Sequence, residues 1–293
     1  MSDLPATEHV DPATEQIDRL DETELARTLV EVHRIAVDAA LGASDAIARA
    51  TTLVVGALAR GGRVVIFGAG TSGRLAVLDA SELPPTFGVD PARVEARIAG
   101  GDAALRRAIE GAEDDAAAGA QAASDLGAQD VAIGVSAGGG AVFVCAALRA
   151  ARVHGAATVA IVNARGTALA READVAIEAL TGAEPIQGST RMRAGTAQKI
   201  VLNAISTGAM IRIGKTYRNR MVDLVATNAK LRARSERLVR EIGGVDDPRA
   251  LLDRAGGSVK IAIVMARRDV ERSAAERLLA AAGGRLAAVI DRA

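Results

Sequence analysis

The chain has 293 residues, 49% of them hydrophobic, which is enough for one large domain or for a medium domain with a small second one. Its 36 basic and 36 acidic residues leave no net charge, so a nucleic-acid partner has no electrostatic support. The single cysteine, Cys145, excludes an intrachain disulfide and, without a signal peptide, indicates a cytoplasmic protein. No membrane partner is expected, because the longest apolar-looking segment, 197–214, carries Lys199 and Arg212.

The first sixty residues predict an irregular start and two helices. Residues 1–20 are polar, and the first few of them are expected to be disordered. Asp21 can cap a helix that runs through Leu41, and Ser44 can begin another that runs through Arg60. Apolar residues at helical spacing predict that these helices pack on a sheet or on a second subunit.

Five short apolar runs then alternate with helical segments. This order predicts a parallel β-sheet with helices on both faces, in which ligands bind outside the carboxyl ends of the strands. The expected strands are residues 64–67, 94–98, 130–135, 157–162 and 175–178. Residues 102–125 are expected to be helical, with a break near Gly111.

The loop after the first strand predicts an anion site. Gly70, Thr71, Ser72 and Gly73 lead into a short helix, whose backbone N–H groups would point at one spot. The pattern GAGTSG also matches the dinucleotide fingerprint, which requires an acidic residue at the end of the next strand, about 20 residues on. Here that strand ends in Ala99-Gly100-Gly101, and Asp102 comes about 30 residues after the loop, which is late for this role. A phosphorylated small molecule is therefore favoured, and a tight turn without ligand is the alternative.

A second glycine-rich turn follows the third strand. It contains Ser136, Gly138 and Gly139 and leads into a helix that runs through Val153. Because both loops follow strands of one parallel sheet, they are predicted to frame a single pocket.

The last hundred residues are predicted to be helical. Residues 189–214 form a long apolar helix and 219–242 a charged one, followed by short helices with a near repeat at 251–264 and 278–290. We place a domain boundary at Gly243–Gly244. The expected organisation is an irregular segment 1–20, an α/β domain 21–242 with a helical lead-in, and a small helical domain 243–293.

Three sequence blocks resemble a known family. GAGTSGRLAVLDASELPPTFG, GSTRMRAGTAQK and MVDLVATNAKL are similar to those of the N-acetylmuramic acid 6-phosphate etherases, which belong to the sugar-isomerase (SIS) superfamily, as does the glucokinase regulatory protein. The resemblance runs from about Thr7 to the C-terminus. It implies an SIS-type α/β fold with a small helical tail, and a homodimer.

The resemblance also implies an activity. The family cleaves the D-lactyl ether at C3 of N-acetylmuramic acid 6-phosphate, giving N-acetylglucosamine 6-phosphate and D-lactate in amino-sugar and cell-wall recycling, without metal or cofactor. It assigns Glu82, in DASE, as the acid on the leaving oxygen and Glu113, in EGAED, as the base. From the residues alone, Glu82 could be a solvated charge where a helix must end before two prolines, and Glu113 part of a solvated acidic run.

Four further residues are candidate ligand contacts. Ser189, Thr190 and Arg191 open the predicted long helix, where capping is the alternative role, and Lys199 either reaches the pocket or extends to solvent. The three histidines form no metal-ligand pattern.

The second loop departs from the family pattern. The family reads close to ASGRTPY, whereas this chain has Gly138, Gly140 and Ala141 in place of serine, arginine and threonine. Two hydroxyls and a charge are therefore missing, and Ser136 is a partial substitute. This leaves two alternatives to an etherase: a sugar-phosphate-binding regulator without turnover, and an aldose–ketose isomerase. Release of lactate distinguishes the etherase from both alternatives, and thermal stabilisation by sugar phosphate without product indicates the regulator.

Overall fold

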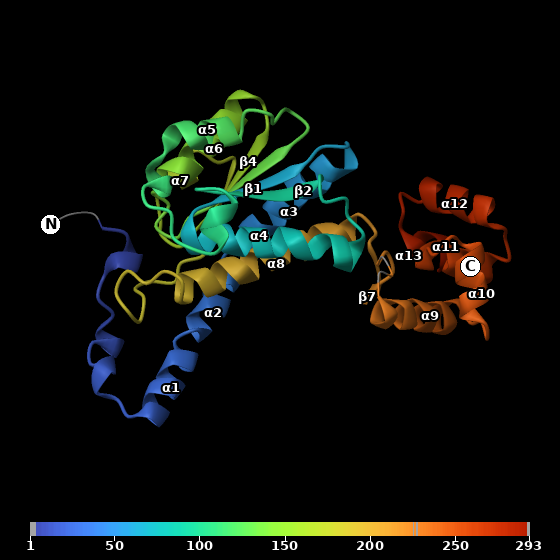
Figure 1. The fold of residues 1–293 in the computed structure, drawn as a ribbon, viewed down its shortest axis with the longest axis horizontal. Coiled ribbons are helices and arrows are strands. Elements are labelled where there is room, and N and C mark those ends of the chain that lie inside the picture. The colour runs from blue at the N-terminus through green and yellow to red at the C-terminus, as the bar shows by residue number, and fades with distance from the viewer. Residues whose placement is uncertain (1–3, 225, 227, 292–293) are drawn as a thin grey trace. The chain divides into compact units, whose positions relative to one another are not determined.

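A computed structural model describes residues 4–224, 226 and 228–291. The chain forms two compact units (Figure 1). The sheet unit comprises Met1–Ser81 and Ala92–Ser206, and the helical unit comprises Glu82–Pro91 and Thr207–Ala293. The expected domain boundary at 243–244 stays a prediction.

The sheet unit is built on five parallel strands in the order β2-β1-β3-β4-β5. The strands are β1 Val64–Gly68, β2 Val94–Ile98, β3 Val131–Val135, β4 Ala157–Val162 and β5 Val175–Glu178. The predicted parallel α/β architecture is confirmed. Every residue of β1 and β3 is buried, which explains their continuous apolar runs. The chain reverses its direction of winding between β1 and β3, and such a switch point opens a crevice at the carboxyl ends of the strands.

Helices cover both faces of the sheet (Figure 1). On one face, α5 (Ala116–Ala122), α6 (Val142–Val153) and α7 (Ala168–Arg171) lie over β1, β3 and β4. Phe67, Ala132 and Leu148 share a buried cluster there. On the other face, α3 (Ser44–Ala59) packs against β1, β3 and β5, with α4 (Gly70–Phe87) and α8 (Arg193–Arg212) nearby.

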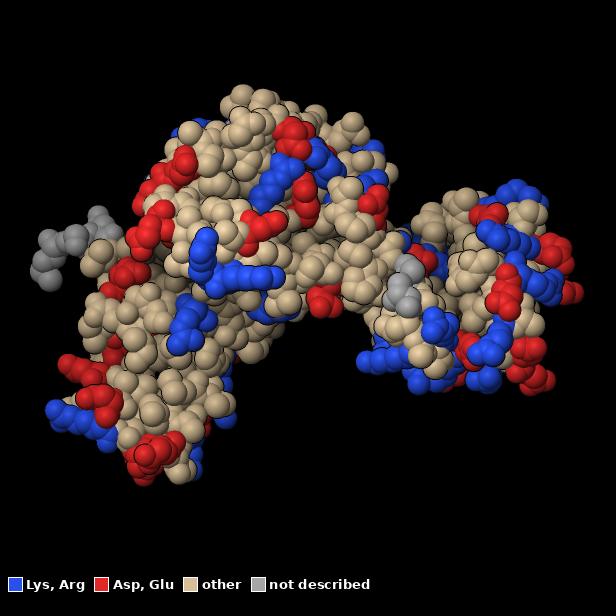
Figure 2. All heavy atoms as spheres, viewed as in Figure 1, with Lys and Arg blue, Asp and Glu red and all other residues tan. Residues whose placement is uncertain are grey.

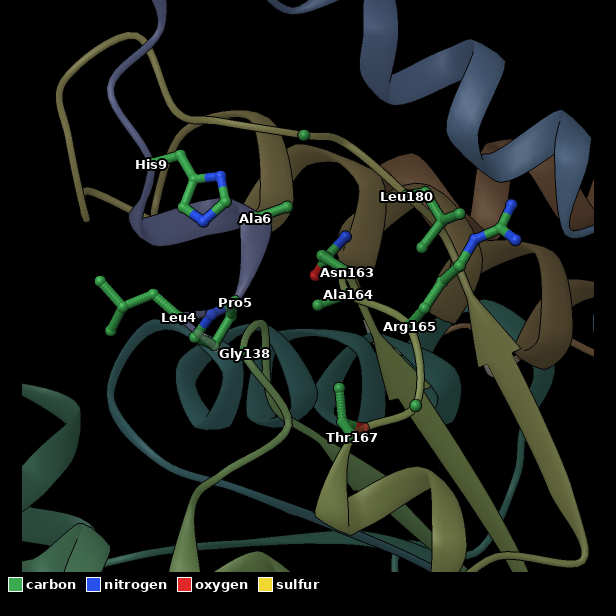
Figure 3. Close-up of a pocket in the computed structure, with 12 residues that line it drawn as sticks. Leu4, Pro5, Ala6, His9, Gly138, Asn163, Ala164, Arg165, Thr167 and Leu180 are labelled. Atoms are coloured by element: carbon green, nitrogen blue, oxygen red, sulfur yellow. The ribbon is translucent and has the colours of Figure 1, made fainter. Parts of the chain in front are cut away.

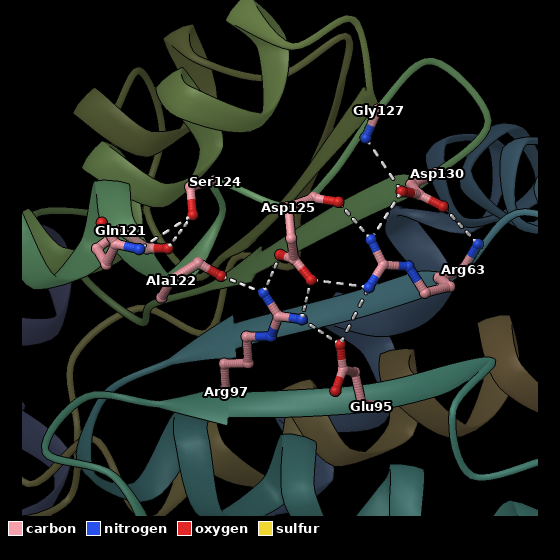
Figure 4. Close-up of polar contacts among 9 residues, drawn as sticks. All are labelled: Arg63, Glu95, Arg97, Gln121, Ala122, Ser124, Asp125, Gly127 and Asp130. Atoms are coloured by element: carbon pink, nitrogen blue, oxygen red, sulfur yellow. Dashed lines mark hydrogen bonds and ion pairs between the residues drawn. The ribbon is translucent and has the colours of Figure 1, made fainter.

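An ionic network lies at the amino-terminal ends of β1 and β3 (Figure 4). Arg63 precedes β1 and donates to Asp125 at 2.8 Å and to Asp130 at 3.2 Å, while the Asp130 carboxylate accepts the Arg63 backbone N–H at 2.7 Å. Arg97 of β2 bonds to Asp125 at 2.6 Å and also to Glu95. These contacts hold the pKa of Asp125 well below its usual range, chiefly through the hydrogen bond from Arg97.

The N-terminal segment is more ordered than expected. Short 3₁₀ turns form at Ala6–Glu8 (η1), Pro12–Thr14 (η2) and Ile17–Arg19 (η3). Asp21 caps α1 (Glu22–Glu31) as predicted, but the single helix expected through Leu41 breaks before α2 (Arg34–Gly42). The break is stabilised from α8, where Arg193 Nε donates to the Val32 carbonyl at 3.1 Å.

The expected helix over residues 102–125 is wrong for most of its length. Only α5 is regular, preceded by the 3₁₀ turns η4 (Asp102–Leu105) and η5 (Ala112–Asp114). Arg74 explains part of the difference, because its guanidinium binds the carbonyls of Leu105 and Arg107. Gly111 then turns the chain with a φ of 70°.

Two other helix boundaries also differ from expectation. The helix that carries Glu82 does not end before the prolines: α4 continues through Pro84 and Pro85 to Phe87. Each proline removes a backbone donor, and the burial of Leu83 and Phe87 in the same turns offsets part of that cost. The long helix starts not at Ser189 but at Arg193, because the Glu184 carboxylate binds the N–H groups of Arg193 and Ala194, both at 2.8 Å.

Besides the C-terminal ends of α4 and α8, the helical unit contains a short hairpin and five helices among its described residues. The hairpin replaces the start of the helix expected at 219–242, since Arg218 takes a left-handed φ of 52°. The elements are β6 Thr216–Tyr217, β7 Arg220–Met221, α9 Ala229–Gly243, α10 Pro248–Arg254, α11 Val259–Arg268, α12 Arg272–Ala281 and α13 Leu286–Ile290. Buried Ile263 and Leu286 lie in its core. The predicted short helices at the C-terminus are confirmed.

Charge and hydropathy add two observations. Basic and acidic side chains are interspersed over the visible face of each unit (Figure 2). Within the described residues, no single helix combines the length and apolar character of a membrane span, although the bent pair Glu22–Gly42 and Ser44–Ala59 meets both criteria when taken together.

Candidate functional site

A pocket of about 430 Å³ lies at the switch point between β1 and β3. The loop after β1 and the loop after β3 both line it, so the expectation that they frame one pocket is confirmed. Residues from three further segments complete it. The lining consists of Pro5, Glu8, Ala69, Gly70, Thr71, Ser72, Glu113, Val135, Ser136, Ala137, Gly138, Gly140, Ala141 and Thr190.

The first loop presents the amino terminus of α4 to the pocket. Gly70 begins the helix with a φ of 51°, and the first N–H groups of a helix have no partner within it. Gly73, also predicted to bind the ligand, does not line the pocket. Its role is packing, because a Cβ there would lie 2.5 Å from Ile98 and 2.8 Å from the Gly68 carbonyl oxygen.

Ser72 is fixed by a buried chain of amide side chains. Its hydroxyl donates to Gln198 Oε1 at 2.9 Å, and Gln198 Nε2 donates to Asn163 Oδ1 at 2.9 Å. Asn163, which directly follows β4, donates in turn to the Ala179 carbonyl at 2.8 Å. Because the Ser72 hydroxyl proton is used inside the protein, Ser72 offers the pocket its backbone N–H and an oxygen acceptor.

The second loop presents the amino terminus of α6. No side chain caps this helix at Ala141, so its first N–H groups are available to an anion. Gly138 lines the pocket, whereas Gly139 does not. With a φ of 65° and a hypothetical Cβ only 2.3 Å from Thr167 Oγ1, Gly139 shapes the loop.

Glu113 enters the pocket from the turn η5. Its side chain is exposed, and Asp115 behind it caps α5 by accepting the Ala118 N–H at 2.9 Å. The two carbonyl contacts of Arg74 fix the segment that leads to this turn. A carboxylate is thus placed in the same pocket as the two helix amino termini.

Of the other predicted site residues, outside the two loops and η5, only one lines the pocket. Thr190 lines the pocket, while Ser189, Arg191 and Lys199 do not. Lys199 Nζ instead donates to Asn203 Oδ1 on the next turn of α8 at 2.5 Å. Glu82 is exposed on the C-terminal part of α4 and is not among the pocket-lining residues, so its catalytic role stays a prediction.

A buried carboxyl lies beside Lys199. Asp79 is 3% exposed and accepts the Asn203 amide at 2.6 Å, but its Oδ2 has no partner among the described residues. Burial raises the pKa of Asp79 above its usual value, although Ser206, Lys199 and Asn203 act in the opposite direction.

A second pocket, of about 670 Å³, adjoins the first (Figure 3). Pro5 and Gly138 line both pockets. Its walls are the N-terminal turn, with His9, and the loop after β4, with Arg165. Among the described residues, no group of three or more His, Cys, Asp or Glu side chains could hold a metal ion.

The sequence alone did not point to three of the site's components. Glu8 and Pro5 line the pocket from a segment that reads as polar and irregular. Gln198 lies in the block GSTRMRAGTAQK, but only the structure, in which this polar side chain of α8 is 1% exposed, marks it as a structural link.

Comparisons with known proteins identify relatives over nearly the whole chain. The family model described as "Glucokinase regulatory protein N-terminal SIS domain" matches residues 46–152, and "SIS domain" matches 110–207. A Gloeobacter violaceus protein named N-acetylmuramic acid 6-phosphate etherase is 44% identical over 98% of this chain and 95% of its own length. Proteins of the same name from Salmonella paratyphi A (45%, with 96% of both chains) and Caldanaerobacter subterraneus (44%, with 97% of this chain and 94% of that one) are similarly close.

Proposed function

Because the chain belongs to the N-acetylmuramic acid 6-phosphate etherases and shares their activity, we propose that the pocket between β1 and β3 is its catalytic site. The observation that supports this proposal is the convergence of one carboxylate, Glu113, with the amino termini of α4 and α6. The helix termini suit a phosphate, and the carboxylate suits proton transfer.

The substrate would lie with its phosphate against the two loops. Gly70, Thr71 and Ser72 would donate from α4, and Ser136, Gly138 and Gly139 would shape the approach to α6. Thr190, which also lines the pocket, would add a hydroxyl. The Ser72–Gln198–Asn163 chain supports this proposal, because a phosphate-binding loop needs fixed N–H directions before its ligand arrives.

The reaction requires an acid and a base. Removal of the C2 proton is feasible when an aldehyde at C1 of the opened sugar stabilises the carbanion, and a carboxylate within about 3 Å can accept that proton. We assign this step to Glu113. The C3 ether oxygen leaves readily only when it is protonated. We propose Glu82 as that acid only because of its place in the DASE block, since Glu82 does not line this pocket. Water then adds to the unsaturated aldehyde with the two roles reversed.

Two broader expectations remain proposals. We propose a homodimer, because of the apolar character of α8 and the scarcity of aromatics, and a cytoplasmic location, because of the single cysteine. A monomer by light scattering at micromolar concentration would contradict the first.

Incubation with N-acetylmuramic acid 6-phosphate and measurement of D-lactate tests the site. Glu113→Gln and Glu82→Gln should each lower kcat by about 10²- to 10⁴-fold, and the exposed neighbour Glu110, which does not line the pocket, provides the matched control Glu110→Gln. Lactate release unchanged in Glu113→Gln would reject the assignment.

The two alternative functions predict different results in the same assay. A regulator of the glucokinase-regulatory-protein type, whose N-terminal SIS domain model matches residues 46–152, would be stabilised by sugar phosphate without forming product. An isomerase would release no lactate and would not discriminate for the lactyl group.

A further inference from the structure

The N-terminal turn η1 forms one wall of the proposed catalytic pocket. Pro5 and Glu8 both line it, although they lie more than a hundred residues before Glu113 and the second loop. The mechanism described above uses neither residue. The turn is therefore a part of the site without an assigned role.

Hydrogen bonds within η1 and from the segment before α8 hold the turn in place. The Glu8 N–H donates to the Pro5 carbonyl at 2.8 Å, and Gln187 Nε2 donates to the Glu8 carbonyl at 3.0 Å. Further along, Thr14 Oγ1 donates to the Pro185 carbonyl at 2.9 Å, and Asp11 pairs with Arg193 at 2.7 Å. The wall is thus anchored to the segment that precedes α8.

The turn also lies directly over the second loop. Thr7 is fully buried, and its hydroxyl has no partner among the described residues. A Cβ placed on Gly138 would lie 3.6 Å from Pro5 Cγ and 3.9 Å from Thr7 Oγ1. These contacts place Glu8 at the pocket next to the loop in which two hydroxyls are missing.

The Glu8 carboxylate is available to a ligand. It is partly exposed, and no hydrogen bond or ion pair to it is present within the described residues. The residues that line the pocket include two carboxylates, Glu8 and Glu113, but neither lysine nor arginine. A carboxylate repels phosphate and accepts hydrogen bonds from hydroxyl and amide groups. Glu8 therefore suits the sugar ring and opposes the phosphoryl end.

We propose that Glu8 is a substrate-binding residue, whose carboxylate accepts a hydrogen bond from a hydroxyl or amide N–H of the amino sugar. In this arrangement the helix amino termini hold the phosphate and Glu8 orients the ring relative to Glu113. The proposal rests on the position of the substrate proposed above.

The expected result is a loss of binding with little loss of turnover. Glu8→Ala should raise KM for N-acetylmuramic acid 6-phosphate by about ten- to a hundredfold, since a hydrogen bond to a charged group is lost, while kcat stays within about threefold. Glu8→Gln retains an acceptor and should show a smaller rise. Glu15→Ala, at an exposed position of the same segment outside the pocket, should match the wild type.

Direct binding separates a ligand contact from a structural effect. Calorimetry with N-acetylglucosamine 6-phosphate and with inorganic phosphate should show weaker binding of the sugar phosphate by Glu8→Ala and unchanged binding of inorganic phosphate. Equal weakening of both would mean that the pocket has been disturbed, and would overturn the proposal.

Two kinetic outcomes would also overturn it. Unchanged KM and unchanged sugar-phosphate affinity would show that Glu8 does not touch the ligand, and a fall in kcat alone would make it an acid or base. If the wild-type protein released no lactate, the catalytic proposal would fail, whereas the binding comparison would still report on Glu8.

Discussion

The side chains of Ser72 and Gln198 meet in a buried hydrogen bond of 2.9 Å, although the residues are 126 positions apart in the sequence. Through Asn163, the same chain of contacts joins the first loop to the end of β4. The proposed phosphate-binding loop is therefore fixed from behind, by groups that do not contact the ligand.

Replacement of this link should cost both stability and affinity. Gln198→Met leaves the Ser72 hydroxyl and Asn163 Oδ1 without partners, so the free energy of unfolding should fall by about 2 kcal/mol, and KM should rise because Ser72 is no longer held. Urea unfolding and lactate kinetics measure the two effects. Gln121→Met, at an exposed position, is the control, with an expected change in unfolding free energy within about 0.5 kcal/mol. Equal stability of the two variants would contradict the role assigned to Gln198.

Restoring a hydroxyl to the second loop should tighten binding. A Cβ at Gly138 has its nearest neighbour at 3.6 Å, so Gly138→Ser fits without displacing the chain. Its hydroxyl can donate to the phosphate, and we expect KM to fall by roughly tenfold. Gly138→Ala adds the carbon without the hydroxyl and should leave KM near the wild-type value. If both variants changed KM alike, the missing hydroxyl would not be the cause.

The neighbouring glycine should not tolerate the same change. Gly139→Ala combines a left-handed φ of 65° with a Cβ only 2.3 Å from Thr167 Oγ1, so the free energy of unfolding should fall by about 2 kcal/mol or more. Thermal denaturation beside Gly138→Ala gives the comparison at adjacent positions. Equal melting temperatures of Gly139→Ala and Gly138→Ala would show that the loop does not require a glycine at position 139.

Asp79 should make stability fall with rising pH. Its folded pKa is raised by burial, so its contribution favours folding below the unfolded value of about 3.9 and is lost as the pH rises toward and through the folded pKa. Asp79→Asn keeps the acceptor for Asn203 and removes the charge. We expect its melting temperature to equal or exceed that of the wild type at pH 8, with the advantage shrinking near pH 4. A lower melting temperature at pH 8 would show that the ionised form is stabilising.

Asp125 should have the opposite pH dependence. Its folded pKa is depressed, so its contribution is fully present above the unfolded value of about 3.9 and is lost as the pH falls below it. Because the Asp125 side chain is half exposed, we expect Asp125→Asn to cost on the order of 1 kcal/mol at pH 7 after solvent screening. The cost should diminish toward pH 3 in urea unfolding. A cost that is independent of pH would exclude this charge as its source.

The sequence predicted the strands more reliably than the helix ends. Continuous β-branched runs mark buried parallel strands, and the glycines after Phe67 and Val135 mark the loops that form the pocket. The start of α8 was misplaced because its cap, Glu184, lies outside the helix and before the residues that seemed to begin it. Contacts of this kind leave no local pattern.

The candidate site shows the same limit. Glu113 was found through its sequence block, and it does line the pocket. Glu8 was not found, because a single acidic residue in a polar segment has no periodicity, and only the folded chain brings it to the loop after β3. Conversely, Gly73 and Gly139 belong to the loop sequences but serve packing and turn geometry.

The cap formed by Glu184 also affects which helix amino termini near the pocket can bind an anion. The backbone carbonyl of Thr190, which lines the pocket, accepts the Gly195 N–H, so the first turn of α8 lies close to the site. The chain has already neutralised that helix end with a carboxylate of its own, fully enclosed in protein. In the proposed binding mode, the amino termini of α4 and α6 attract the phosphoryl group, whereas the amino terminus of α8 is already occupied by Glu184.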